Sequence, residues 1–222
     1  MKRSERTRLA ILDAAEHLFS AYGPDATSMR QITGLAQVNL SAVNYHFGSK
    51  EALIDEVFQR RLNALNQERL QLLEQYQAST PDAPLKASLV VHAFFAPLIR
   101  HAYSVDQKKQ HLLPLPEQSN SDPSSFIRVL CTDERTGVFT VFRTALLAAL
   151  PGVPEDEIVW RFHFMLGATF YALQGTAGLR KALLLAPSPE PEDMAKLEAR
   201  LISFLLGGLR APLPENSSIL NH

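Results

Sequence analysis

Helical periodicity is the feature that most constrains what this sequence can fold into. Apolar residues recur at steps of three and four through almost the whole chain, whereas the two-residue alternation of half-buried strands is weak everywhere. Gly–Pro, Gly–Ser and proline-rich stretches interrupt this pattern and divide it into separate segments. We therefore predict an all-α protein, with helices over about residues 4–22, 29–36, 40–46, 50–77, 85–102, 126–150, 155–185 and 191–209.

The composition narrows the class of protein. A chain of 222 residues, 46% of them hydrophobic, can bury one large core or two modest ones. The single cysteine, Cys131, excludes an internal disulfide framework and multi-cysteine metal sites, and His92, His101 and His111 are too irregularly spaced for a metal. No apolar run approaches the roughly 18 residues of a membrane helix, and Asp13 interrupts the stretch where a secretory signal would continue. We expect a cytoplasmic protein without membrane contact, metal or other cofactor.

The charge is distributed unevenly along a chain whose net charge is only −1. Residues 1–50 hold six Lys/Arg against four Asp/Glu, so that this end is weakly basic on an acidic body. This permits nucleic-acid contact without demonstrating it. We predict one domain over 1–50, together with the start of the next helix to about 62, a second helical domain over 51–210, and a loose tail over 211–222.

The first three predicted helices have the arrangement of a helix-turn-helix, because they are short and a tight connection joins the second to the third. Ser28 and Gln31 have the spacing of a capping box at the start of the second helix. Asn39 can cap the third helix. In a DNA groove, amide and hydroxyl groups read base edges or hold phosphates. With Ala42, Val43 and Phe47 facing inward, the side chains left to point away are Asn39, Ser41, Asn44 and Tyr45.

Basic residues flank this unit on both sides. Lys50 stands at the first turn of the fourth helix, where it and the free backbone amides favour a phosphate. The N-terminal Lys2, Arg3, Arg6 and Arg8 can add contacts to phosphates or the minor groove, although a solvated arm is the commoner arrangement.

Residues 26–36 and 38–50, preceded by Ile11–Phe19 and Tyr22–Gly23, resemble the helix-turn-helix of the TetR family of bacterial transcription regulators. The most specific part is the run from Tyr45 to Lys50. The resemblance implies a homodimer that docks two third helices in successive major grooves of a near-palindromic double-stranded DNA operator. It also implies a C-terminal ligand-binding and dimerisation domain, and repression that a small molecule relieves.

Transferred position by position, the resemblance implies specific DNA contacts. Thr27 and Ser28 serve helix capping in part, and one of the two suffices for a DNA contact. His46 is either a phosphate contact or a packing residue. The implied phosphate contacts are Thr27, Tyr45, His46 and Lys50, and the residues facing bases are Asn39, Leu40, Ser41 and Asn44.

Two residues depart from the family pattern. Gln37 stands where the turn usually has glycine, which costs on the order of 1 kcal/mol if the turn needs a positive φ. Leu40 stands where a polar or basic residue is common, so one contact can be to a thymine methyl group.

The C-terminal part contains a helix that is apolar on most of its circumference, around residues 160–172, and is therefore expected in a core or at a dimer seam. By resemblance, the helices over 155–185 and 191–209 form the dimer interface, with Phe204, Leu205 and Leu209 in it. Residues 150–168 also resemble the branch of the family that includes fatty-acid-responsive regulators of Pseudomonas. This suggests a fatty acid or acyl thioester as the effector.

A ligand pocket inside this helical body would be apolar with a few polar anchors. Arg161 or His163 could anchor a carboxylate, although Arg161 could equally pair with a neighbouring acid or cap across the dimer, and His163 could be a core residue. Each aromatic residue could also be ordinary core. The candidate walls are His92, Phe94, Phe95, Leu98, Phe139, Phe142, Phe164 and Tyr171.

Two other functions compete with that of a regulator. An α-helical enzyme is disfavoured, because the sequence has no Walker A, Rossmann glycine or His-Glu-x-x-His motif. Cys131 has acids beside it, which raise the pKa of a thiol. A helical binding protein without operator recognition stays open because of the departures at Gln37 and Leu40.

Overall fold

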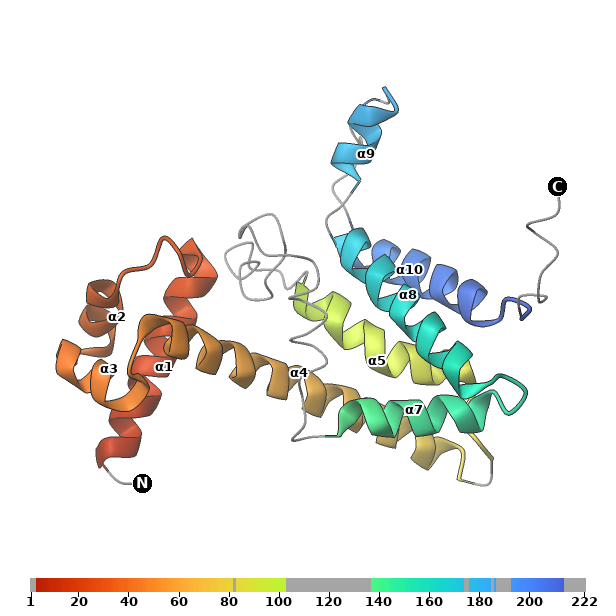
Figure 1. The fold of residues 1–222 in the computed structure, drawn as a ribbon, viewed down its shortest axis with the longest axis horizontal. Coiled ribbons are helices and arrows are strands. Elements are labelled where there is room, and N and C mark those ends of the chain that lie inside the picture. The colour runs from red at the N-terminus through yellow and green to blue at the C-terminus, as the bar shows by residue number, and fades with distance from the viewer. Residues whose placement is uncertain are drawn as a thin grey trace. The chain divides into compact units, whose positions relative to one another are not determined.

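The computed structural model describes residues 3–81, 83–102, 137–173, 176–184, 186 and 193–213, and every regular element within them is a helix (Figure 1). This confirms the predicted all-α class. None of the described helices combines the length and apolarity needed to cross a bilayer. The helices are α1 (Arg3–Tyr22), α2 (Met29–Ala36), α3 (Leu40–Phe47), α4 (Lys50–Ser79), α5 (Ala87–Ala102), α7 (Val138–Ala149), α8 (Glu155–Leu173), α9 (Ala177–Ala182) and α10 (Met194–Leu209).

The predicted helix over 155–185 is wrong in one respect, because α8 ends at Leu173 and α9 begins separately at Ala177. In the sequence, Gly175 falls between the two helices, and a glycine in a helix interior costs about 1 kcal/mol relative to alanine. The helix α10 begins at Met194, where the Asp193 carboxylate accepts the Ala195 backbone N–H at 2.9 Å. Residues 126–136 and 191, where two predicted helices begin, lie outside the described residues.

The chain divides into two compact units. The first contains α1, α2, α3 and α4 as far as Glu68. The second contains α4 from Arg69, α5 as far as Ile99, and α7 to α10.

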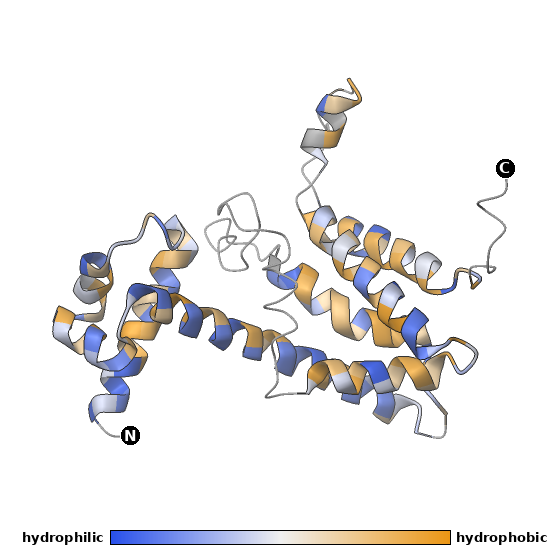
Figure 2. Cartoon of the chain, viewed as in Figure 1, coloured by the Kyte–Doolittle hydropathy of each residue, from blue (hydrophilic) through white to orange (hydrophobic). Residues whose placement is uncertain are grey.

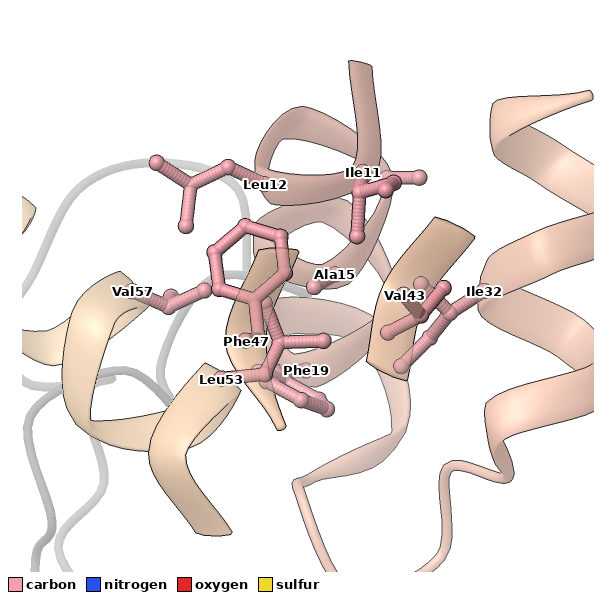
Figure 3. Close-up of a cluster of buried hydrophobic side chains, with 10 residues drawn as sticks. Ile11, Leu12, Ala15, Phe19, Ile32, Val43, Phe47, Leu53 and Val57 are labelled. Atoms are coloured by element: carbon pink, nitrogen blue, oxygen red, sulfur yellow. The ribbon is translucent and has the colours of Figure 1, made fainter. Parts of the chain in front are cut away.

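The core of the first unit is built from residues at helical spacing on all four of its helices. Ile11 and Phe19 of α1 meet Ile32 of α2, Val43 and Phe47 of α3, and Leu53 and Val57 of α4 (Figure 3). All of these side chains are buried. The helix α3 is only two turns long, and isolated helices of this length are marginal in water, so this packing is what fixes its orientation.

Ion pairs tie the beginning of α4 to α1. Arg60 lies 2.5 Å from Asp13, and Arg61 donates to Glu16 at 2.8 Å. The hydrogen bond to Asp13 raises the pKa of Arg60, whereas burial lowers the pKa of Arg61. These contacts hold the N-terminal part of α4 against α1, which supplies half of the buried residues of this core.

Phenylalanine side chains fill the interior of the second unit, and α5 is correspondingly apolar along its middle (Figure 2). The Phe94 ring of α5 lies 5.0 Å from Phe142 of α7 and 4.8 Å from Phe162 of α8, both edge-on. The fully buried Arg69 of α4 lies over the Phe94 ring, with its guanidinium carbon 3.7 Å from the ring centroid.

A backbone carbonyl of α5 holds Arg69. The Phe94 carbonyl accepts the Arg69 Nε–H at 2.9 Å. Both residues are fully buried, so the arginine donates to a backbone group inside the unit.

Candidate nucleic-acid interface

The predicted capping box fixes the start of α2. The Ser28 hydroxyl accepts the Gln31 backbone N–H at 3.3 Å, and the Gln31 side-chain oxygen accepts the Ser28 backbone N–H at 2.7 Å. Ser28 itself stays exposed. The sequence prediction of this cap is confirmed in both directions.

The turn between α2 and α3 requires a positive φ at Gln37, which is the case in which a cost was expected for a residue other than glycine. Gln37 has φ 56° and ψ 42°, and its backbone N–H closes the end of α2 on the Gly34 carbonyl. A residue other than glycine in the left-handed conformation costs roughly 1–2 kcal/mol. The exposed Gln37 is therefore a strained residue at the centre of the helix-turn-helix.

Replacing this residue will stabilise the protein. We expect Gln37→Gly to raise the free energy of unfolding by about 0.5–1 kcal/mol, because relief of the strain exceeds the entropy that glycine adds to the unfolded chain. Urea unfolding at fixed protein concentration measures the change. Gln59→Gly, at an exposed position inside α4, should instead lose about 1 kcal/mol. Destabilisation by both substitutions would contradict the strained turn.

The outward face of α3 carries polar and apolar side chains that the core leaves free. Val43 and Phe47 are buried, and the residues between them point away, with Tyr45 82% exposed. Asn39 caps the helix, because its side-chain oxygen accepts the Ala42 backbone N–H at 2.8 Å. The exposed side chains on this face are Asn39, Leu40, Ser41, Asn44 and Tyr45.

Two residues predicted to hold phosphates have other surroundings. Thr27 is only 1% exposed, and its hydroxyl donates to the Gly23 carbonyl at 2.8 Å, so its side chain is not presented to DNA as the sequence analysis expected. The sequence requires a DNA contact from only one of Thr27 and Ser28, and Ser28 is the exposed one. His46 is half-buried, with its ring 5.1 Å from that of Tyr45 and edge-on to it.

At the beginning of α4, the Lys50 side chain is more available to a phosphate than the backbone amides are. Ser49 caps the helix, and its hydroxyl accepts the Ala52 N–H at 3.1 Å. Hydrogen bonds from its own backbone amide and from the Ser49 hydroxyl lower the pKa of Glu51. Two of the amides expected to be free are therefore used within the helix, and the half-buried Lys50 is the group that remains.

The basic N-terminal residues are part of a helix and not of a loose arm, because α1 already begins at Arg3. Arg3 and Arg6 are exposed, whereas Lys2 lies outside the described residues. Arg8 binds Glu56 at 2.6 Å and lies over the Phe47 ring at 5.3 Å from its centroid. It therefore helps to fix α3 against α1 and α4, a role that sequence reasoning missed.

Comparison with known families agrees with this geometry. Residues 11–57 match the family described as bacterial regulatory proteins, tetR family, and residues 92–208 match the tetracyclin repressor-like C-terminal domain. The chain belongs to the TetR family. Its first unit thus contains the family's DNA-binding helix-turn-helix.

Individual relatives match over part of the chain. The HTH-type transcriptional regulator AcrR of Shigella flexneri is 34% identical over 93 residues, 41% of each chain. An HTH-type transcriptional repressor of Mycobacterium tuberculosis is 45% identical over 53 residues, 24% of this chain and 28% of that protein. The chain thus spans less than half the length of these relatives. The crystal structure of a putative TetR-family regulator from Mesorhizobium loti shares the fold, with a TM-score of 0.55, 18% identity, and coverage of 94% of this chain and 98% of that one.

In the second unit of this TetR-family chain, large apolar side chains on α8 and α10 are exposed. Phe164 and Tyr171 were expected in pocket walls but are 62% and 64% exposed, and His163 is exposed beside Trp160. Conversely, Leu205 and Leu209 were expected in the dimer interface but are buried within the unit. Periodicity alone did not distinguish the two faces, because both are apolar. We call the exposed set the α8–α10 face, namely Trp160, Phe164, Tyr171 and Phe204.

The predicted polar anchors of a ligand are engaged within the protein. Arg161 is buried, donates to Glu157 at 2.8 Å and donates to the Leu209 carbonyl at the end of α10 at 2.5 Å. It therefore pairs with a neighbouring acid, which is one of the alternatives that the sequence left open, and it bonds the end of a helix of its own chain. A ligand carboxylate at Arg161 or His163 stays a prediction. His92 contacts the Tyr76 hydroxyl at 3.0 Å and Glu198 at 3.3 Å.

The predicted pocket walls on α5 and α7 do point into the unit. Phe94, Phe95 and Phe142 are buried and Phe139 is partly buried, with Leu98 beside them.

Among the residues that the structure describes, no group of His, Cys, Asp and Glu could hold a metal. His101 binds Glu68 at 2.8 Å, and His111 and Cys131 lie outside those residues.

Proposed function

We propose that this chain is a homodimeric transcriptional repressor that acts in the cytoplasm on a near-palindromic operator and releases it on binding a small apolar or amphipathic molecule. The observation that supports operator binding is the outward face of α3, which leaves Leu40, Ser41, Asn44 and Tyr45 exposed on a two-turn helix fixed by a buried core. Such a helix fits the major groove of B-DNA.

The contacts divide into phosphate and base contacts. Lys50, Tyr45 and His46 hold phosphates, and Ser28 replaces the buried Thr27 at the start of α2. Leu40, Ser41 and Asn44 face base edges, and so does Asn39, whose amide orientation is fixed by its cap to the Ala42 N–H. Phosphate contacts position the protein, and base contacts specify the sequence.

Removing single phosphate contacts tests this division. Lys50→Ala should weaken operator binding roughly tenfold and reduce the slope of log affinity against log salt by about 1, equally for all sequences. Tyr45→Phe, which removes only the hydroxyl, should weaken binding roughly three- to tenfold. Fluorescence anisotropy at several salt concentrations measures both effects. Lys86→Ala, at an exposed lysine of the second unit, is the matched control and should change neither quantity. Unchanged affinity in both test variants would contradict the proposed docking.

The α8–α10 face supports the homodimer. Its aromatic side chains are more than half exposed, and an apolar patch of this kind on a regulator typically marks a protein interface. A two-fold dimer buries the same face of both copies, and an obligate interface of this kind tends to exceed roughly 2,000 Å². Two α3 helices would then reach half-sites about 34–36 Å apart, or a multiple of that.

The aromatic interior of the second unit supports an apolar or amphipathic effector, with Phe95, Phe139 and Phe142 as its contacts. The resemblance of residues 150–168 to the fatty-acid-responsive branch makes fatty acids and their acyl thioesters the first compounds to test. We expect one range of chain lengths in a series of saturated carboxylates and acyl thioesters to release operator DNA at micromolar concentration, as measured by anisotropy. Alkyl sulfates of equal length control for detergent action. No release at any length would contradict this effector class.

A further inference from the structure

We propose that α3 reads A·T base pairs, with Asn44 on an adenine and Leu40 on a thymine methyl group. This inference rests on the proposed operator binding and adds its sequence preference. The first observation is that the outward face of α3 has no arginine or lysine, since residues 38–49 contain none. Bidentate Arg or Lys contacts are the commonest means of reading guanine, so this helix lacks the usual guanine reader.

The structure distinguishes two asparagines that the sequence alone treats alike. Reading the adenine N6 and N7 atoms requires both the oxygen and the NH₂ group of one side-chain amide. The Asn39 oxygen accepts the Ala42 backbone N–H at 2.8 Å, so the cap holds its amide against the start of α3. Asn44 is exposed, and its amide makes no hydrogen bond within the residues that the structure describes. Asn44 therefore has both groups available for an adenine.

Leu40 supplies the apolar half of the contact. Its side chain is 49% exposed at the first turn of α3, while Val43 and Phe47 pack inward. A leucine can neither donate nor accept a hydrogen bond, and the thymine 5-methyl is the apolar group on the floor of the major groove. The exposed Leu40 side chain on the outward face of α3 therefore fits a thymine methyl group.

The two contacts fall on nearby base pairs. Leu40 and Asn44 are four residues apart and are therefore neighbours on the helix surface. One helical turn rises about 5.4 Å, whereas one base pair rises about 3.4 Å. Leu40 and Asn44 therefore contact two A·T base pairs in each half-site, and these base pairs are adjacent or separated by one position.

Selection of duplexes from a random pool by the full-length protein provides the operator for the test. The selection is repeated with Asn44→Ala and Leu40→Ala, and each variant should relax the preference at one A·T position per half-site. In the wild-type operator, deoxyuridine in place of the thymine that Leu40 reads removes only the methyl group and should weaken binding about three- to fivefold. 7-Deazaadenine at the other position removes N7 and should weaken binding roughly tenfold.

Combining the DNA and protein changes shows which residue reads which group. Deoxyuridine should have no effect on Leu40→Ala, and 7-deazaadenine should have none on Asn44→Ala. Leu35→Ala, which removes another exposed leucine of the same unit, should retain the full deoxyuridine effect. Recovery of operators whose α3-dependent positions are G·C, or unchanged affinity for the deoxyuridine duplex, would overturn the inference while operator binding stands. Recovery of no duplex at all would instead overturn operator binding, and the inference with it.

Discussion

Phe204→Arg should convert the proposed dimer into a monomer and lower operator affinity at least about a hundredfold. Phe204 is 69% exposed on α10, and an interface that buries it would place two arginines, one from each copy, in an apolar environment. A monomer reaches one half-site only and loses the gain of about 10²–10⁴ that a second linked contact provides. Sedimentation equilibrium measures the assembly and anisotropy measures the affinity.

The control is a charge placed on another exposed apolar residue. Val141 of α7 is 41% exposed and lies outside the α8–α10 face, so Val141→Arg should remain dimeric and bind the operator normally. The protein's single tryptophan, Trp160, is itself in the α8–α10 face and reports on burial. Its emission should shift to longer wavelength in Phe204→Arg and not in Val141→Arg. A Phe204→Arg protein that stays dimeric would place the interface elsewhere.

Arg69→Ala should lower the free energy of unfolding by about 3–5 kcal/mol. The substitution leaves a cavity beside the Phe94 ring and removes the donor to a buried carbonyl. Arg69→Met should cost less, because it fills most of the volume without a buried charge.

Urea unfolding at one protein concentration compares these variants. Arg143→Ala is the matched control, because Arg143 is an exposed arginine paired with Glu155 and such pairs contribute about 0–1 kcal/mol. A loss in Arg69→Ala no larger than that in Arg143→Ala would contradict the role given to the buried arginine.

The first unit could be predicted closely from the sequence because its signals are local. The capping box of Ser28 and Gln31, the cap at Asn39 and the inward positions Val43 and Phe47 are short-range patterns, and all are present in the structure. What the sequence could not show is that the Thr27 side chain is buried and that its hydroxyl donates to the Gly23 carbonyl. Both depend on where a hydroxyl points, and the residue type does not specify that.

The second unit was harder to predict because its partners are distant in sequence. Arg161 bonds the end of α10, 48 residues away, and Arg69 bonds Phe94, 25 residues away. No local sequence pattern predicts pairs of residues that are so far apart in the chain. The helix α8 is apolar on both sides, so its sequence could not decide whether Phe164 or Met165 faces the core, and the structure buries Met165.

The central claim is that the outward face of α3 recognises a specific DNA sequence, and a single titration tests it most directly. The full-length protein is titrated by fluorescence anisotropy against its selected duplex and against an unrelated duplex of the same length, at several salt concentrations. We predict a preference of at least about a thousandfold for the selected duplex, a steep salt dependence on both, and loss of the preference in a Leu40→Ala/Asn44→Ala double variant. Equal weak binding to both duplexes, or a preference that survives the double variant, would contradict the assignment of DNA recognition to α3.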